Sequence, residues 1–114
     1  TWIADNEYYL VDEDNLKITY HDFVADADCT LLVSKNNNLN LPQNKFDEAL
    51  NESWEGDTIS NQHIVVKVQH ENNDGKMVLA TWEYNEYAFA IIGEDVSDST
   101  SIPKVALYII YNLD

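Results

Sequence analysis

Apolar and polar residues alternate along three segments in the second half of the chain. Residues 63–70, 77–84 and 87–93 each show the period of two that is typical of a β-strand with one covered face. The polar loop 71–75 and the tight turn Asn85-Glu86 connect these segments in order. The pattern therefore predicts an antiparallel meander.

The lengths of the two connections predict how these strands pair. The tight turn places Trp82 opposite Phe89, and the longer loop places Val68 opposite Val78. The apolar face of the meander then consists of Ile64, Val66, Val68, Val78, Ala80, Trp82, Tyr87, Phe89 and Ile91. The opposite face is mixed in character, so we expect the apolar face to be the covered one.

The last segment of the chain has the period of a helix. Thr100 or Ser101 can cap such a helix, and Pro103 fits its first turn. Its apolar residues recur at three- and four-residue spacing and are Ile102, Val105, Ala106, Ile109, Ile110 and Leu113. The β-branched residues argue for a strand instead, but Pro103 and the apolar stripe favour a helix that covers the meander.

Two runs of β-forming residues in the first half, 8–11 and 16–20, flank the turn-forming residues 12–15. This pattern predicts a hairpin. A loop of four residues would place Val11 opposite Leu16.

The residues after this hairpin are less regular. A third strand is expected over 29–35, and the polar stretch 36–61 follows with scattered apolar residues. Phe46 and Leu50 have helical spacing, so this stretch holds either a short helix around residues 45–53 or a partly ordered loop.

Together these elements predict a single acidic α+β domain that spans residues 1–114. We expect an antiparallel sheet of about six strands with a C-terminal helix packed on one face. A chain of this length with 45% apolar residues can bury a core of its own.

The charge of the chain limits the classes of partner that it can bind. The net charge is −15, from 21 acidic residues against six lysines and no arginine. Phosphate groups are bound by clustered Lys and Arg, so direct binding of DNA or RNA is excluded. The charge suits a cationic partner or divalent cations, or it serves solubility alone. We expect an unknown protein or small ligand as the partner.

No residue pattern in the sequence predicts catalysis. The chain has no nucleophile elbow, phosphate-binding glycine loop, zinc-protease motif or dinucleotide fingerprint. Cys29 is the only cysteine, so no internal disulfide can form. It lies beside the apolar run 31–33, where we expect a buried, inert thiol. The sequence therefore predicts a protein that is not an enzyme and that has no cofactor.

Calcium is the metal that the sequence favours. His63 and His70 are seven residues apart and belong to opposite faces of a strand, which argues against a histidine-centred site. The candidate calcium ligands are Asp12, Asp14, Asp26 and Asp28. Neither turn has the spacing of an EF-hand loop, and aspartate also favours turns for local reasons.

Two of the three tryptophans are candidates for a binding surface. Trp82 falls on the face that the helix would cover, where a packed core is the expected role. Trp2 and Trp54 lie outside the predicted elements, and either one would be a binding candidate if it were exposed.

Two segments of the chain carry a resemblance to a known family. The first covers residues 16–35, with Ile-Thr-Tyr at 18–20 and Thr-Leu-Leu-Val-Ser-Lys at 30–35. The second covers residues 64–93, with the Leu-Ala-Thr-Trp strand at 79–82. Together with the final helix they resemble an extracytoplasmic domain of unknown function from Gram-positive bacterial lipoproteins and anti-sigma-factor-like membrane proteins. The polar stretch has no counterpart in it.

The resemblance implies a sensing, binding or interaction role outside the cytoplasm. The sequence has no apolar run of transmembrane length, so contact with a membrane would run through an anchor outside this chain. The charge supports two alternatives. One is an acidic mimic of nucleic acid that inhibits a DNA-binding protein, and the other is a calcium-dependent binding module.

Overall fold

The computed structural model describes residues 3–12, 14–36, 39–46 and 51–114. In chain order its elements are β1 (Ile3–Asp12), β2 (Asn15–Asp22), β3 (Ala27–Lys35), the 3-10 turn η1 (Gln43–Lys45), β4 (Asn51–Asp57), β5 (His63–His70), β6 (Val78–Tyr84), β7 (Tyr87–Glu94) and α1 (Ser101–Tyr111). The predicted α+β fold is confirmed, with seven strands in the described residues.

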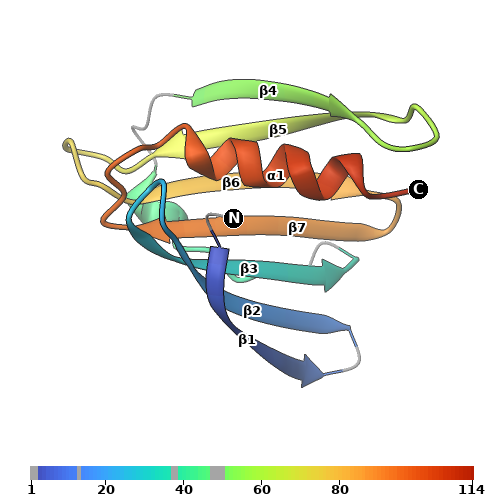
Figure 1. The fold of residues 1–114 in the computed structure, drawn as a ribbon, viewed down its shortest axis with the longest axis horizontal. Coiled ribbons are helices and arrows are strands. Elements are labelled where there is room, and N and C mark those ends of the chain that lie inside the picture. The colour runs from blue at the N-terminus through green and yellow to red at the C-terminus, as the bar shows by residue number, and fades with distance from the viewer. Residues whose placement is uncertain (1–2, 13, 37–38, 47–50) are drawn as a thin grey trace.

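All of these strands form one antiparallel sheet in the order β1-β2-β3-β7-β6-β5-β4. The sheet consists of two meanders, β1–β3 and β4–β7, which meet where β3 pairs with β7. Figure 1 shows α1 lying across the β4–β7 half, on one face of the sheet. No helix in the described residues combines the length and apolar content that a membrane span requires.

The main core lies between α1 and the second meander. Trp82 and Phe89 stack beneath the helix with their ring centres 5.1 Å apart and their planes 8° from parallel. Ile102 and Ile110 of the helix are fully buried against this layer. The prediction that Trp82 points inward under a C-terminal helix is therefore confirmed. Tyr87 differs, because it opens β7 beside the turn at the rim of the sheet, where it is 39% exposed.

A smaller apolar cluster covers part of the opposite face. Phe46 packs there against Leu79 and Ala90 of the sheet, and Leu39 and Leu41 extend the contact. The backbone of this segment is tied to the β5–β6 loop, since the N–H of Asn72 donates to the carbonyl of Lys45 at 2.8 Å. The sequence pattern did not predict this second cover.

The polar stretch contains a strand where a helix or loop was expected. Residues 51–57 form β4, which pairs with residues 63–69 of β5 and places Trp54 opposite Val66. Residues 43–45 make one 3-10 turn, and residues 47–50 lie outside the described part of the chain. The predicted helix was therefore wrong for residues 51–53, and the alternative of a loop was wrong for 51–57, because the edge of β5 supplies pairing that local spacing does not reveal.

Two of the predicted registers need correction. In the first hairpin Leu10 pairs with Leu16, because Asp12 pairs with Asn15 and a register shift lies between Leu10 and Asp12. The predicted partner of Leu16, Val11, is therefore one residue off.

In the second half, Val68 pairs with Ala80 rather than Val78. A shift of two residues keeps every side chain on its predicted face, so the prediction of the core survived it. The predicted pairing of Trp82 with Phe89 is confirmed.

Candidate functional site

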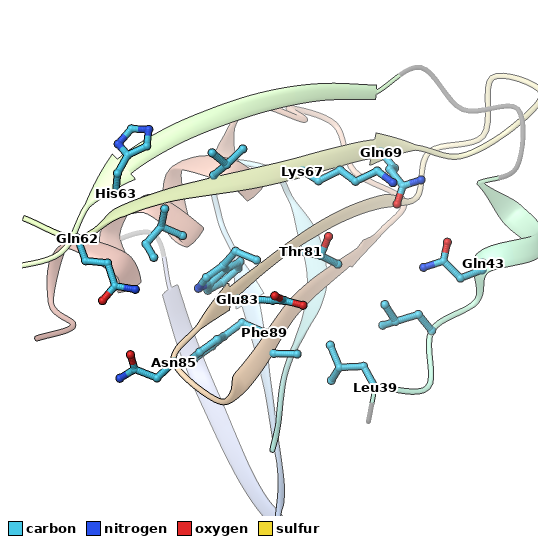
Figure 2. Close-up of a pocket in the computed structure, with 15 residues that line it drawn as sticks. Leu39, Gln43, Gln62, His63, Lys67, Gln69, Thr81, Glu83, Asn85 and Phe89 are labelled. Carbon is cyan, nitrogen blue, oxygen red and sulfur yellow. The ribbon is translucent and has the colours of Figure 1, made fainter. Parts of the chain in front are cut away.

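An open groove of about 720 Å³ lies on the face of the sheet opposite α1. Its floor comes from β5, β6 and β7, and the segment that carries Leu39, Leu41 and Gln43 forms one wall. Figure 2 shows Thr81 and Glu83 pointing from the floor toward the side where this wall stands. The helix has no share in this face, so the groove remains accessible to a partner.

Most of the functional groups in the groove are polar and uncharged. Its amide and hydroxyl side chains are Gln43, Gln62, Gln69, Thr81 and Asn85. They can donate and accept hydrogen bonds without a fixed charge. Lys67 and Glu83 add one cation and one anion. Val65 adds a half-exposed apolar side chain to the lining of the groove. Such a lining suits a polar chain segment with some apolar side chains.

His63 stands at one end of the groove between two carboxylates. Its Nδ1 lies 2.8 Å from Asp57 Oδ1, and its Nε2 lies 3.1 Å from Glu55 Oε1. The hydrogen bonds to Asp57 and then to Glu55 raise the pKa of His63. Because both ring nitrogens already contact carboxylates, the imidazole is poorly placed to take a proton from a substrate.

This arrangement predicts a titration that NMR can follow. We expect the imidazole of His63 to titrate above the ordinary histidine value of about 6.5 in the folded protein. A raised pKa makes a stabilising contribution that is complete below the unfolded value and is lost as pH rises through the folded value. Replacing both partners, in the Glu55→Gln and Asp57→Asn double variant, should lower the pKa toward that of the urea-unfolded chain. An unchanged pKa in that variant would contradict the assignment.

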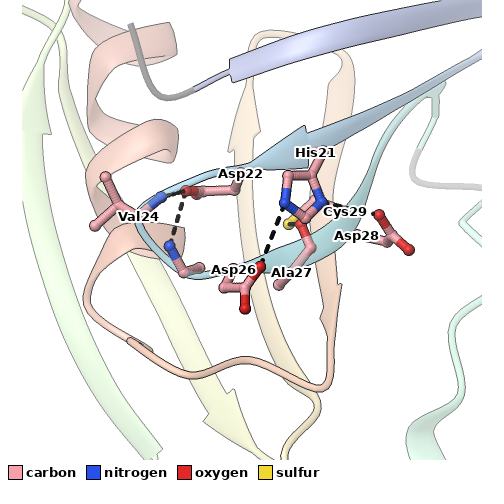
Figure 3. A network of polar contacts seen from close by, with 8 residues as sticks. His21, Asp22, Val24, Asp26, Ala27, Asp28 and Cys29 are labelled. Carbon is pink, nitrogen blue, oxygen red and sulfur yellow. Dashed lines mark hydrogen bonds and ion pairs between the residues drawn. The ribbon is translucent and has the colours of Figure 1, made fainter.

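A second histidine cluster lies at the turn between β2 and β3. Figure 3 shows His21 between Asp26, with an oxygen 3.5 Å from Nε2, and Asp28, with an oxygen 3.0 Å from Nδ1. The hydrogen bond to Asp28 is the main cause that raises the pKa of His21. The ring also meets Phe23 edge-on at 5.0 Å. As at His63, both nitrogens are already in contact with carboxylates.

The same turn contains a buried carboxylate, also drawn in Figure 3. Asp22 Oδ1 accepts hydrogen bonds from the backbone N–H groups of Val24 and Ala25, at 2.9 and 3.0 Å. Its other oxygen, Oδ2, accepts one from Ser101 Oγ at 2.6 Å, at the start of α1. Asp22 is fully buried, and it joins the turn to the helix. Its role is structural, because solvent and ligands cannot reach it.

The structure separates the four predicted calcium ligands into two groups. Asp12 and Asp14 lie at the β1–β2 turn, whereas Asp26 and Asp28 lie at the β2–β3 turn. These turns are at opposite ends of β2, which spans roughly 23 Å for a strand of this length. Asp26 and Asp28 converge on His21, but no group of three or more His, Cys, Asp or Glu side chains in the described residues is arranged so that it could hold a metal ion.

The remaining predictions concern a cysteine and two tryptophans. Cys29 is buried, as expected, and its burial, with the nearby charge of Asp22, raises the pKa of its thiol to about 12. Trp54 lies on the edge strand β4, partly exposed and partly packed on the core. Trp2 lies outside the described residues.

Sequence reasoning missed the contacts of the two β5 histidines because it had no strand at 51–57. With β4 in place, Asp57 pairs with His63, and Glu52 reaches His70 at 3.3 Å. The sequence held only a weak indication of β4. Residues 51–57 have a single large apolar residue, Trp54, among polar ones, and a turn and the clear strand 63–70 follow them.

Comparisons with known proteins add no family to this geometry. No family model matches the chain, and neither curated proteins nor solved structures give a significant match. A function for this chain therefore has to be inferred from the site itself.

Proposed function

We propose that this chain is a non-enzymatic binding domain that recognises a positively charged protein segment on the groove-bearing face of its sheet. The observation that carries the proposal is the open groove in a molecule of net charge −15. The negative electrostatic potential of the surrounding carboxylates would raise the concentration of a cationic partner near this face. The amides and hydroxyl of the groove would then bind its backbone and polar side chains.

The chemistry of the described residues supports binding over catalysis. His21 and His63 each have both ring nitrogens in contact with carboxylates. Cys29 is buried, and its thiol stays protonated at neutral pH because its pKa is raised to about 12. His21, His63 and Cys29 are three of the residues that general acid–base or thiol chemistry would most readily use, and the third histidine, His70, contacts Glu52 through Nε2.

The resemblance noted in the sequence supports a place outside the cytoplasm, with any membrane attachment made through an anchor beyond this chain. A domain in that position would act as a sensor or as an interaction module. Its cationic partner could belong to several protein classes, and a DNA-binding protein inhibited by an acidic surface is one of them.

A salt-dependent titration tests the proposal. Labelled peptides of equal length that are lysine-rich, glutamate-rich or uncharged would be added to the protein and followed by fluorescence anisotropy. We expect binding of the lysine-rich peptide alone, weakening at least about tenfold from about 0.05 M to about 0.5 M salt because counter-ions screen the attraction. Binding of all three peptides, or of none, would contradict the proposal.

Two matched variants locate the binding face. Thr81→Lys places a cation on the groove floor, whereas Tyr108→Lys places the same cation at an exposed position of α1. We expect Thr81→Lys to reduce the affinity for the lysine-rich peptide several-fold more than Tyr108→Lys does. Equal effects would show that the groove is not the site.

A further inference from the structure

Among the residues that the structure describes, no strand pairs with the outer edge of β4. β4 is the last strand in the pairing order, and Figure 1 shows it at the border of the sheet with β5 as its neighbour. Alternate residues of such an edge strand direct their backbone N–H and C=O groups away from the sheet. The seven residues of β4 therefore offer about three outward-facing residues to which an added strand could bond.

The side chains of β4 give this edge a definite character. Glu55 and Asp57 lie on the groove face, two residues apart, and are more than half exposed. Glu52 and Trp54 belong to the helix side, where Gly56 allows a close approach of Leu107. The strand contains no lysine. The edge is therefore acidic on both faces, with one partly exposed indole between the charges.

We propose that the β4 edge binds an extended basic peptide by strand addition, with lysine or arginine alternating with apolar residues. Two cationic side chains would lie beside Glu55 and Asp57, the apolar residue between them would lie opposite Gly56, and the next apolar residue would lie opposite Trp54. This inference rests on the proposed function because it assumes a cationic partner, and it places an extended part of that partner along β4, beside the groove and not in it. Opposite charges on neighbouring strands are favourable, whereas like charges are not.

The same carboxylates decide which strand can be accepted. A second copy of β4 would bring glutamates and aspartate against each other, so self-pairing at this edge is disfavoured. Charged edges protect many sheets from aggregation in this way. A basic strand is not repelled, and its cationic side chains are attracted by the same carboxylates. His63 holds Oε1 of Glu55 and Oδ1 of Asp57, and each carboxylate has a second oxygen to offer.

The test uses a synthetic peptide of alternating valine and lysine with blocked ends, measured by isothermal titration calorimetry and by amide NMR shifts. Two derivatives carry N-methyl groups on alternate residues, one on the valines and one on the lysines. Each keeps the charge but removes half of the backbone donors. Strand addition predicts that one derivative loses at least about tenfold in affinity while the other binds nearly normally, because only one set of N–H groups faces β4.

A matched pair of variants tests the position. Glu55→Gln with Asp57→Asn removes two charges from the edge, and Glu94→Gln with Asp95→Asn removes two from the end of β7. We expect the first pair to reduce the affinity for the peptide about fivefold to tenfold and the second pair to change this affinity little. NMR shifts should centre on β4. Circular dichroism would verify that both variants fold.

The outcomes separate this inference from the proposed function. If both N-methylated peptides bind like the parent, or if the two double variants behave alike, strand addition at β4 is wrong. The groove proposal would survive that result if Thr81→Lys still weakened the parent peptide. If the parent peptide does not bind at all, both proposals fail.

Discussion

The Asp22→Ala variant is expected to lose about 3 kcal/mol of unfolding free energy, because three donors, two of them buried and one partly buried, lose their acceptor together. These donors are two backbone N–H groups of the β2–β3 turn and the hydroxyl of Ser101. Each buried group left without a partner costs about 1–3 kcal/mol, and water entering the gap would recover part of the loss. Urea unfolding followed by tryptophan fluorescence measures the change.

A competing effect could reduce this loss. Burying a carboxylate is itself costly, and replacing a buried charge sometimes stabilises a protein. Here the carboxylate satisfies donors that remain after its removal, and it lies at the N-terminal end of α1, where the helix dipole favours a negative charge. The unsatisfied donors should therefore outweigh the recovered solvation. A stability loss below about 1 kcal/mol would show the opposite.

Two further variants separate the contributions. Asp22→Asn keeps the shape of the side chain and one acceptor oxygen, so it should lose about half as much as Asp22→Ala. Ser101→Ala removes one donor while leaving the turn bonded, and we expect a loss of about 1 kcal/mol. If Asp22→Ala and Ser101→Ala gave equal losses, the bonds to Val24 and Ala25 would contribute nothing.

The sheet and its helix could be predicted because their residues show a clear period in the sequence. The face of β5 to β7 that lies toward α1 is buried, so apolar residues such as Val66 and Ile91 recur on it at every second position. The helix buries a stripe that includes Ile102 and Ile110, which recurs with helical spacing. Burial on one side leaves a pattern that remains readable even when the register is wrong by two residues.

β4 could not be predicted because neither of its faces is deeply buried. At the border of the sheet Trp54 and Gly56 are partly buried and the other residues of β4 are exposed, so the alternation of buried and exposed residues that marks an inner strand is weak. Its strand geometry comes from pairing with β5, a tertiary effect that local composition does not encode. The contacts of Glu55 and Asp57 with His63 therefore could not be predicted from the sequence.

The buried carboxylate and the groove depend on long-range contacts as well. Asp22 belongs to a turn rich in aspartate, and its partner Ser101 is 79 residues away in the sequence. Leu39 and Leu41 could be recognised as apolar residues in a polar stretch. Only the fold shows that they form a wall over the outer face of the sheet.

The largest stability loss is expected for Trp82→Ala, at about 4 kcal/mol of unfolding free energy. Trp82 is 4% exposed and stacks on Phe89 beneath α1, so its removal leaves a cavity at the centre of the helix–sheet contact. The indole N–H is buried and has no hydrogen-bond partner in the described structure, so the loss would come from packing alone.

That last point makes a conservative substitution informative. Trp82→Phe keeps an aromatic ring and removes an N–H that bonds to nothing, so it should lose only about 1–2 kcal/mol. Trp54→Ala provides a control at the border of the same face, where the side chain is only partly buried, and it should lose about 1–2 kcal/mol as well. Urea unfolding followed by circular dichroism suits all three variants, since fluorescence would change with the tryptophan content. If Trp82→Ala were no more destabilising than Trp54→Ala, the helix could not be seated on the sheet through this ring, and the face opposite the groove would need a different cover.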